Sequence, residues 1–363
     1  MNYKETLFFI AKSLTISLED KNKAEIEIIL KTTDIDWDAV VKVSTAHLVF
    51  SALYCNFKRA DFLHYLPEEL VTYMAYITNV NRLRNEEIIA QARGLNTLLL
   101  ANNITPIFLK GTGNLLAEIY EDKAERMVGD IDFLFSIDDY PKAIKVIREF
   151  GYLPQSINNF KHIPYRHYPR LIKKNKISGV EIHSQLLNSK YEDEFNYSFV
   201  KKDIQIKNGV AVLSYANKLN LSIIANQIND QGFDYKTMAL RNAYDVFLLS
   251  KKTNAKAAMI ALDKLKHPLH CFLAACYEVF NKVDSLEYNK TKKAASYLSV
   301  FNNQFTKPIT GLSKRIKMYI FIKRTLYVLH KSLKHKEYLI FLFKSLTDKN
   351  WYKIKLIQLG IKK

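Results

Sequence analysis

The segment RMVGDIDFLF, residues 126–135, carries the pattern that decides the fold. Successive residues of a β-strand point to opposite faces, so Asp130 and Asp132 share one face. Ile131 and Phe133 share the other face, where they can bury against helices. Two adjacent carboxylates repel each other, and a divalent cation removes that cost. The segment therefore predicts a strand that presents two acidic residues to a metal ion.

An α/β stretch of about residues 104–190 surrounds this strand. PIFLKGTGNLLAEIY (106–120) predicts a short strand, a Gly turn and a helix that continues to its final Tyr. PKAIKVIREF (141–150) predicts a second helix. Residues 166–173 and 179–185 predict two more strands, separated by a short polar connection that is typical of a hairpin.

A third carboxylate lies on the later strand, where Glu181 and His183 share one face. If this strand lies beside the first, Glu181 completes a cluster that can hold two metal ions for phosphoryl displacement. A lone Asp-x-Asp also occurs in glycosyltransferases and Ca²⁺ loops, so the ordered set of elements is the more specific signal. His183 either orients Glu181 or contacts substrate, whereas a lone strand histidine is more often structural.

The turn Lys110-Gly111-Thr112-Gly113 predicts a phosphate site. Glycine allows the backbone to approach a ligand closely, and a helix N-terminus offers N–H donors and a favourable dipole. Lys110 contacts the triphosphate in this interpretation, and it is a solvated strand-end lysine in the alternative. Arg126 likewise neutralises phosphate charge or pairs with a nearby glutamate.

Other charged residues favour structural interpretations. His162, Arg166, His167 and Arg170 belong either to the acceptor side or to an exposed basic strand, which we favour. Arg241 and Asp245 are four residues apart, the spacing of an ion pair within one helix.

The organisation predicted for the whole chain is α+β. Residues 1–95 form a helical region, including a long helix that begins near residue 79, and 96–215 form the core. Residues 216–363 form a second helical region. No apolar stretch reaches the roughly 18 residues of a membrane span. Three cysteines without zinc-like spacing (Cys55, Cys271 and Cys276) favour a reduced, cytoplasmic protein.

The charge is uneven along the chain. Of the net charge of +18, residues 311–363 contribute +12, from 14 Lys and Arg against two acids. This surplus indicates either a surface for RNA, another polyanion or a membrane, or a solvated face. We favour the solvated face, because Lys outnumbers Arg 43 to 11 and Arg is the better residue for gripping phosphates.

Four stretches carry a family resemblance: FLKGTGNLLAEIY (108–120), RMVGDIDFLF (126–135), FGYLP (150–154) and GVEIHSQL (179–186). Over about residues 90–250 the chain resembles uncharacterised bacterial nucleotidyltransferases of the DNA polymerase β superfamily. The resemblance implies a minimal polymerase β-like core with helical flanks. It also implies two Mg²⁺ or Mn²⁺ ions and transfer of a nucleoside monophosphate from an NTP such as ATP to a hydroxyl, with release of pyrophosphate.

By the same resemblance, Asp130 and Asp132 are the metal pair, and Glu181 holds the metal that activates the acceptor hydroxyl. Residues 111–113 take the place of the superfamily's Gly-Ser turn. Two features depart from the pattern: Ser184 stands where an aromatic residue is usual, and residues 225–230 lack the expected histidines.

Two alternatives accompany the nucleotidyltransferase interpretation. The first is a catalytically silent module of the same fold that binds nucleotide or nucleic acid. The second, an Asp-x-Asp glycosyltransferase, is disfavoured because a helical region precedes the motif rather than a nucleotide-binding α/β half. The acceptor (small molecule, protein or RNA) and the base of the NTP stay open at this point.

Overall fold

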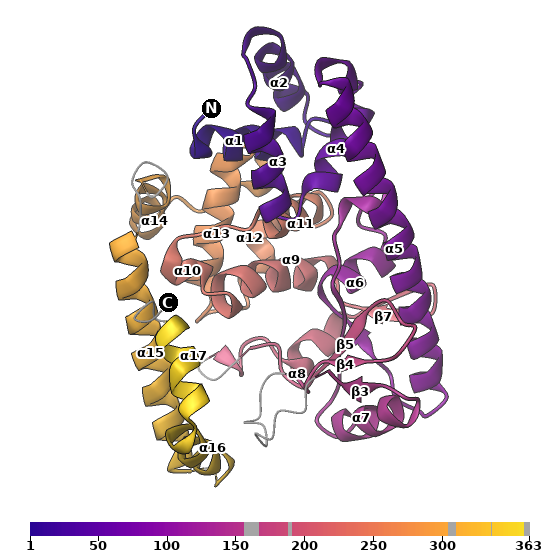
Figure 1. Cartoon of the computed structure of the whole chain (residues 1–363), viewed down its shortest axis with the longest axis vertical. Helices are drawn as coiled ribbons and strands as arrows, with labels where there is room; N and C mark the ends of the chain where they lie inside the picture. Colours follow the sequence, from indigo (N-terminus) through magenta and orange to yellow (C-terminus); the bar gives the residue numbers. More distant parts are fainter. Residues whose placement is uncertain (156–166, 188–190, 304–309, 335, 359–363) are drawn as a thin grey trace.

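The computed structural model describes residues 1–155, 167–187, 191–303, 310–334 and 336–358. A mixed sheet lies against helices from both halves of the chain, which confirms the expected α+β class (Figure 1). The predicted helical character of the N-terminal region is confirmed by α1 (Tyr3–Ser13), α2 (Asp20–Thr32), α3 (Trp37–Ala46), α4 (Phe50–Arg59), the 3₁₀ turn η1 (Leu63–Tyr65) and α5 (Glu68–Leu100).

The helix α5 is longer than the sequence indicated. It has 33 residues, begins at Glu68 rather than near residue 79, and runs across residue 95. Pro67 stands at its N-cap and two glutamates occupy its first turn, where negative charge is favourable to the helix dipole. Exposed Tyr73 and Tyr76 interrupt the apolar periodicity there, which explains the late predicted start.

The sheet has the strand order β3-β4-β5-β2-β1-β7-β6. Its strands are β1 (Ile107–Phe108), β2 (Asp130–Leu134), β3 (Leu153–Pro154), β4 (Leu171–Ile172), β5 (Gly179–His183), β6 (Gln205–Lys207) and β7 (Val210–Val212). The strands β3, β6 and β7 were not predicted, because two or three residues are too few to show a period of two. The strand expected over 166–173 is observed only as β4, and residue 166 lies outside the described residues.

Helices border the sheet and continue after it. They are α6 (Lys110–Leu116), η2 (Lys123–Glu125), α7 (Tyr140–Glu149), α8 (Tyr197–Val200), η4 (Lys201–Asp203), α9 (Tyr215–Ile224), the π-helical turn η5 (Ala225–Asn229), α10 (Gly232–Tyr235), α11 (Leu240–Ser250), α12 (Ala255–Ala258), α13 (Lys266–Val279) and η6 (Asp284–Leu286). Apolar side chains of the N-terminal helices, the sheet, α9, α11 and α13 form one buried cluster. The site on the sheet is therefore held by a core that both flanking regions share.

Four more helices follow in the described residues, and the first of them contributes Tyr297 and Phe301 to this core. They are α14 (Lys292–Asn303), α15 (Thr310–Ser332), α16 (Lys336–Thr347) and α17 (Lys349–Gln358). In Figure 1, α15–α17 run down the side of the molecule opposite α5. Among the described helices, none combines the length and the apolar character that a membrane crossing requires.

Candidate active site

Two neighbouring parallel strands bring the predicted carboxylates together. In the β2–β5 ladder, Asp132 is directly opposite Glu181, and Asp130 is opposite Gly179. This pairing confirms the expectation that the two strands lie side by side. The side chain of Asp132 is buried, whereas Asp130 and Glu181 are half-buried. Acidic side chains thus meet at one place on the sheet.

Lys110 lies between two of these carboxylates. Its Nζ is 2.6 Å from Asp132 Oδ1 and 3.6 Å from Glu181 Oε2. Lys110 is the first residue of α6 and has φ +49°, a left-handed conformation that is unfavourable for a residue with a Cβ. The lysine is therefore held against the acids at a conformational cost, and it is not a freely solvated strand end.

His183 contacts the same two acids from within the sheet. Its Nε2 is 2.9 Å from Asp132 Oδ1 and 3.6 Å from Glu181 Oε2, and the imidazole is buried. The ring of His167 lies 5.0 Å from that of His183, centroid to centroid. Ligand atoms of Asp132, Glu181 and His183 lie within 4.8 Å of one another, the only group of this kind among the described residues. Asp130 lies outside this group.

Asp130 is paired with Arg170 of the segment before β4. The distance from Arg170 Nη2 to Asp130 Oδ1 is 2.5 Å. The guanidinium crosses Gly179, where an added Cβ would overlap its Nε, so the glycine leaves room for this ion pair. The sequence interpretation missed Arg170 by treating it as exposed. The clue to this role was Gly179, which lies opposite Asp130 and leaves space for the guanidinium. That pairing is known only once the register of β2 and β5 is known. His162 and Arg166 lie outside the described residues.

The three acids differ in their electrostatic environment. Burial would raise the pKa of Asp132, but Lys110 and His183 outweigh it and hold the pKa well below its usual value. Burial is likewise outweighed for Glu181 by His183 and Lys110, so its pKa is lowered. For Asp130, burial raises the pKa; Arg170 opposes this rise, and the other two carboxylates add to it. Asp130 is thus the acid whose charge the protein compensates least.

The predicted phosphate turn is buried and closely packed. The Thr112 hydroxyl donates to the backbone carbonyl of Asp130 at 2.8 Å. A Cβ on Gly113 would lie 2.6 Å from the carbonyl oxygen of Phe108, and one on Gly111 would lie 2.9 Å from a Val128 methyl group. Residues 111–113 therefore also dock α6 tightly onto β1 and β2.

The helix α6 ends earlier than expected, at Leu116, because Glu118 adopts a left-handed conformation with φ +55°. Tyr120 consequently lies in the loop that follows, where its hydroxyl donates to Asp245 Oδ1 at 2.6 Å. Asn114 Nδ2 donates in turn to the Tyr120 hydroxyl at 3.2 Å. This loop connects α6 to a carboxylate on α11.

Arg126 pairs with the same carboxylate, Asp245, through its Nε at 3.1 Å from each oxygen. Among the described ion pairs, Arg126 has none with Glu121 or Glu125, which pair with Arg59 instead. The expected ion pair between Arg241 and Asp245 is also absent from the described residues. Arg241 Nε is instead buried without a hydrogen-bond partner in the described part of the chain. The sequence spacing misled here because Asp245 is engaged by Arg126 and Tyr120, which lie far from it in the chain.

A small pocket opens beside the acidic cluster and is strongly basic. Its wall includes Lys110, Arg126, Lys218 and Arg241, with Asp245 as the carboxylate among them. Lys218 is 3% exposed, and its ammonium donates to the backbone carbonyl of Leu213. Burial, helped by the positive charge of Lys207, lowers the pKa of Lys218 to about 7. The free volume of this pocket is about 40 Å³, and four cationic side chains against one carboxylate on the wall make it suited to a small anionic group.

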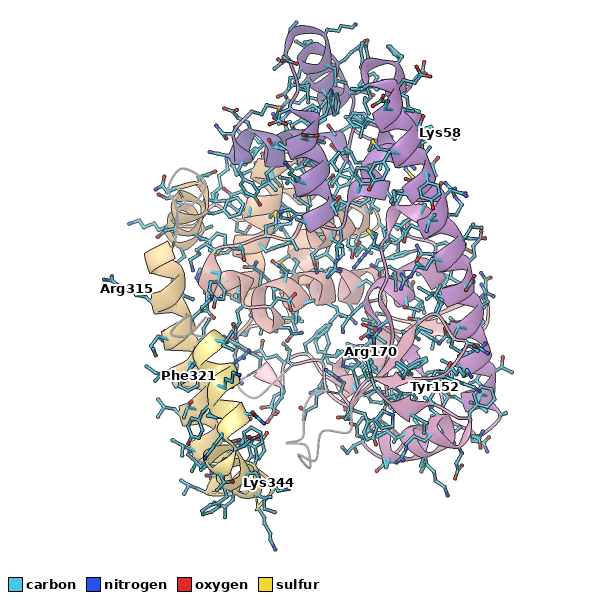
Figure 2. All side chains as sticks on the ribbon, viewed as in Figure 1. Lys58, Tyr152, Arg170, Arg315, Phe321 and Lys344 are labelled. Carbon is cyan, nitrogen blue, oxygen red and sulfur yellow. The ribbon has the colours of Figure 1, made fainter. Side chains whose placement is uncertain are left out.

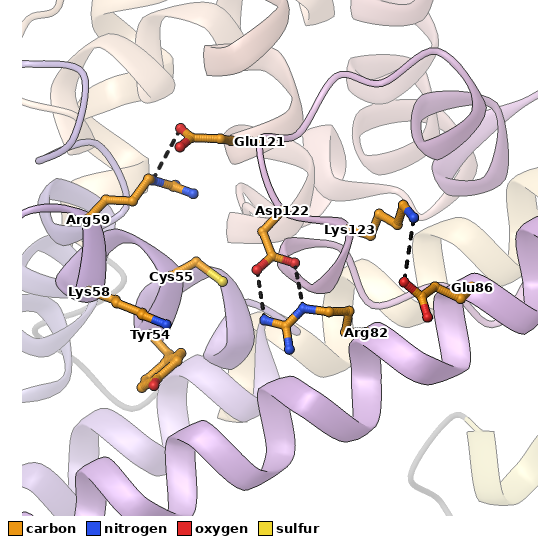
Figure 3. Close-up of a pocket in the computed structure, with 9 residues that line it drawn as sticks. All are labelled: Tyr54, Cys55, Lys58, Arg59, Arg82, Glu86, Glu121, Asp122 and Lys123. Atoms are coloured by element: carbon orange, nitrogen blue, oxygen red, sulfur yellow. Dashed lines mark hydrogen bonds and ion pairs between the residues drawn. The ribbon is translucent and has the colours of Figure 1, made fainter.

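A larger cavity, of about 520 Å³, lies between α4, α5 and η2 (Figure 3). Its charges largely pair across the opening: Arg82 with Asp122, Lys123 with Glu86, and Arg59 with Glu121. Burial raises the pKa of Cys55, on its wall, to about 12, so that thiol is a poor nucleophile. Paired charges leave little net attraction for an ionic ligand.

The sequence model of one protein family, described as an uncharacterised nucleotidyltransferase, matches residues 33–281. The chain belongs to this family. The matched region of this nucleotidyltransferase family member contains the acidic cluster, the basic pocket and the cavity of Figure 3. It ends before α14, so the last four helices lie outside the match. We found no significant match among curated proteins or among solved structures.

Proposed function

We propose that this nucleotidyltransferase moves a nucleoside monophosphate from an NTP to a hydroxyl group, with Mg²⁺ or Mn²⁺ held by Asp130, Asp132 and Glu181. One observation carries the proposal: Asp132 and Glu181 are register partners on parallel strands, with the basic pocket beside them. Membership in the family supports nucleotidyl transfer in general. A polymerase β-like origin of the core is part of the proposal.

The residues present fit a divalent cation. Carboxylate oxygens are the ligands that Mg²⁺ and Mn²⁺ prefer. The chain's own cations already occupy positions against them, since Lys110 bridges Asp132 and Glu181 and Arg170 contacts Asp130. These side chains mark where positive charge is stabilised. Bound divalent ions would supply charge neutralisation for the phosphates and a lower pKa for the attacking hydroxyl.

The basic pocket is proposed to hold the phosphates of the NTP. Lys110 lies in both the acidic cluster and the pocket wall, so it connects the reacting phosphate to Arg126, Lys218 and Arg241. The acceptor oxygen attacks the α-phosphorus, the bond from that phosphorus to the bridging oxygen breaks, and pyrophosphate leaves. The hydroxyl proton passes to water. We assign Glu181 to the acceptor side, where it would hold the metal ion that lowers the pKa of the attacking hydroxyl.

His183 is proposed to position rather than to react. It is buried, and its Nε2 contacts Asp132 Oδ1, the same oxygen to which Lys110 Nζ donates, so two side chains fix this carboxylate. Fixing a carboxylate in this way preorganises a metal ligand, as partners outside the coordination shell commonly do.

A second candidate function is the catalytically silent nucleotide-binding module. The observation in its favour is that Lys110 and Arg170 already neutralise the acidic cluster, which a metal-free module would also need. Metal binding distinguishes the two functions. We expect Mn²⁺ to bind the protein, as measured by electron paramagnetic resonance, and Asp132→Asn to lose that binding.

The decisive experiment incubates the full chain with each labelled NTP and Mg²⁺ or Mn²⁺. Labelled protein, RNA and small molecules are then separated, with Asp132→Asn as the matched control. Label that appears only with the wild type supports the transferase and identifies the acceptor class. Nucleotide binding without metal binding or transfer would support the silent module.

A further inference from the structure

The helices α15 and α16 carry an apolar face that the described part of the chain leaves uncovered. On α15 the exposed side chains include Met318, Ile322, Leu326 and Leu329, and exposed Leu333 follows in the turn directly after the helix. The spacing of four, four and three residues places the first four on one side of the helix. Leu326 is 61% exposed and Leu333 83% exposed, so these residues face solvent. We name this row the α15 stripe.

The helix α16 repeats the arrangement. Leu339, Phe343 and Leu346 are exposed at spacings of four and three residues, and Phe343 is 62% exposed. The helices α15 and α16 pack against each other, so both rows belong to one compact unit. Two rows of exposed apolar side chains on one pair of packed helices are typical of an interaction surface.

Lysines follow the apolar rows at fixed positions. Exposed Lys323 directly follows Ile322, Lys334 follows Leu333, and exposed Lys344 follows Phe343 (Figure 2 labels Lys344). One residue corresponds to about 100° around a helix, so Lys323 on α15 and Lys344 on α16 border the apolar rows on the same edge, and Lys334 lies in the turn after α15. The surplus of 14 basic over two acidic residues in 311–363 makes the surroundings cationic.

The charge and the apolar rows together restrict the occupant. A second copy of the chain would bring one cationic face against another, which like-charge repulsion opposes. RNA would satisfy the lysines but would leave the leucines against a polar backbone, and only two of the 14 basic residues are Arg. An anionic lipid surface offers phosphate head groups to the lysines and acyl chains to the apolar rows.

We propose that α15 and α16 bind the surface of an anionic lipid bilayer without crossing it. The apolar rows enter the boundary between head groups and acyl chains, and the long lysine stems allow their ammonium groups to reach lipid phosphates. This surface lies outside the family match and is independent of the proposed chemistry. It would hold the catalytic region at a membrane surface.

The test measures sedimentation of the full chain with vesicles that contain phosphatidylglycerol and with vesicles of phosphatidylcholine alone. We expect binding to the anionic vesicles only, and weakening when salt rises from about 0.1 M to about 1 M, because the Debye length falls from about 10 to 3 Å. Failure to bind anionic vesicles at low salt overturns the proposal.

Two triple variants separate the effect of net charge from the effect of lysines on or next to α15 and α16. Changing Lys323, Lys334 and Lys344 to Gln should weaken binding roughly a hundredfold, since each lysine near an anionic surface contributes about fivefold. The matched control changes three exposed lysines elsewhere to Gln and should bind like the wild type: Lys42, Lys202 and Lys290. Equal loss in both variants would indicate net charge alone and would overturn the assignment to α15 and α16.

A second pair of variants tests the apolar rows. Leu326, Leu329 and Leu333 are changed to Ser, and the control changes Tyr76, Val80 and Leu83 of α5 to Ser. The control residues form an exposed row on α5 that Glu87 borders. Changing them therefore removes a similar apolar area from a helix face without lysines. Only the α15 variant should lose vesicle binding. Circular dichroism verifies that each variant is folded.

Hydrogen exchange on the unmodified protein provides a test that needs no variant. Anionic vesicles should protect amides of α15 and α16 and leave α5 unchanged. Protection of these helices by RNA in place of vesicles, or by raised protein concentration with dimerisation, would overturn the lipid assignment in favour of the respective partner.

Discussion

The acidic cluster on the sheet and the basic helices at the end of the chain both gather like charges, but they differ in burial. Asp132 is buried and has Lys110 and His183 at defined distances, whereas Lys323 and Lys344 are exposed. Charges inside a protein interact strongly and must be compensated by specific groups, whereas exposed charges are screened by salt. The first region is therefore suited to a ligand of defined geometry, and the second to an extended anionic surface.

Within the acidic cluster, the largest effect is expected for Asp132→Asn. Loss of this carboxylate should reduce nucleotidyl transfer on the order of a thousandfold, because charge stabilisation at the reacting phosphate would fail. The variant should also be about 1–3 kcal/mol less stable, since Lys110 and His183 lose their buried anionic partner. Transfer assays and urea unfolding measure the two effects.

Asp130→Asn provides the contrast to this variant. The raised pKa of Asp130 shows that its charge is poorly compensated, so at pH 7 its removal should leave stability within about 0.5 kcal/mol of the wild type or slightly above it. Transfer should still fail. A destabilisation as large as that of Asp132→Asn would contradict the distinction between the two acids.

The second prediction concerns Lys110. Lys110→Gln should weaken NTP binding about thirtyfold, because a charged contact to phosphate is lost. It should strengthen Mn²⁺ binding in the absence of NTP, because the ammonium no longer occupies the space between Asp132 and Glu181. Calorimetric titration with Mn²⁺ and with a non-hydrolysable NTP measures both changes. Weakened Mn²⁺ binding would show that Lys110 supports the metal site instead of competing with it.

The third prediction uses pH to compare a buried cation with exposed ones. The pKa of Lys218 is about 7 in the folded protein, below its unfolded value near 10.4, so the unfolded chain binds more protons between these values. Burial of Lys218 therefore lowers the free energy of unfolding by its full amount below pH 7, and this destabilisation disappears as pH rises toward 10. Lys218→Met should raise unfolding free energy by a few kcal/mol at pH 6 and much less at pH 9.

The same Lys218→Met variant should bind NTP about tenfold more weakly at pH 6, because the pocket loses a cation. An exposed control, Lys202→Met, should change neither stability nor NTP affinity. Equal NTP affinity of Lys218→Met and wild type would remove Lys218 from the proposed phosphate site.

The smallest effect is expected for Gly179→Ala. The added Cβ would displace Arg170 from Asp130, and transfer should fall about threefold through misplacement of the carboxylate. The double variant Arg170→Gln/Gly179→Ala should transfer nucleotide as fast as Arg170→Gln alone, because both substitutions act on one ion pair. Gly129→Ala is the matched control, since a Cβ there meets no atom within 4 Å. Additive losses would show an independent role for the glycine.

Much of the fold could be predicted locally. The strand that carries Asp130 and Asp132, the strand of Glu181 and His183, and the helical flanks follow from apolar periodicity, which neighbouring residues determine. Among the misses were strands of two or three residues, such as β7, and a helix start obscured by exposed tyrosines on α5. Both are places where tertiary contacts override a weak local pattern.

What the sequence by itself determined was which side chains share a face, because the side-chain period of a strand is a property of its own backbone. Only the tertiary structure decided which faces meet. The register that sets Asp132 beside Glu181, the approach of Arg170 across Gly179, and the pairing of Arg126 with Asp245 join residues far apart in the chain. Such contacts depend on how strands and helices pack together, and no short stretch of sequence encodes that packing.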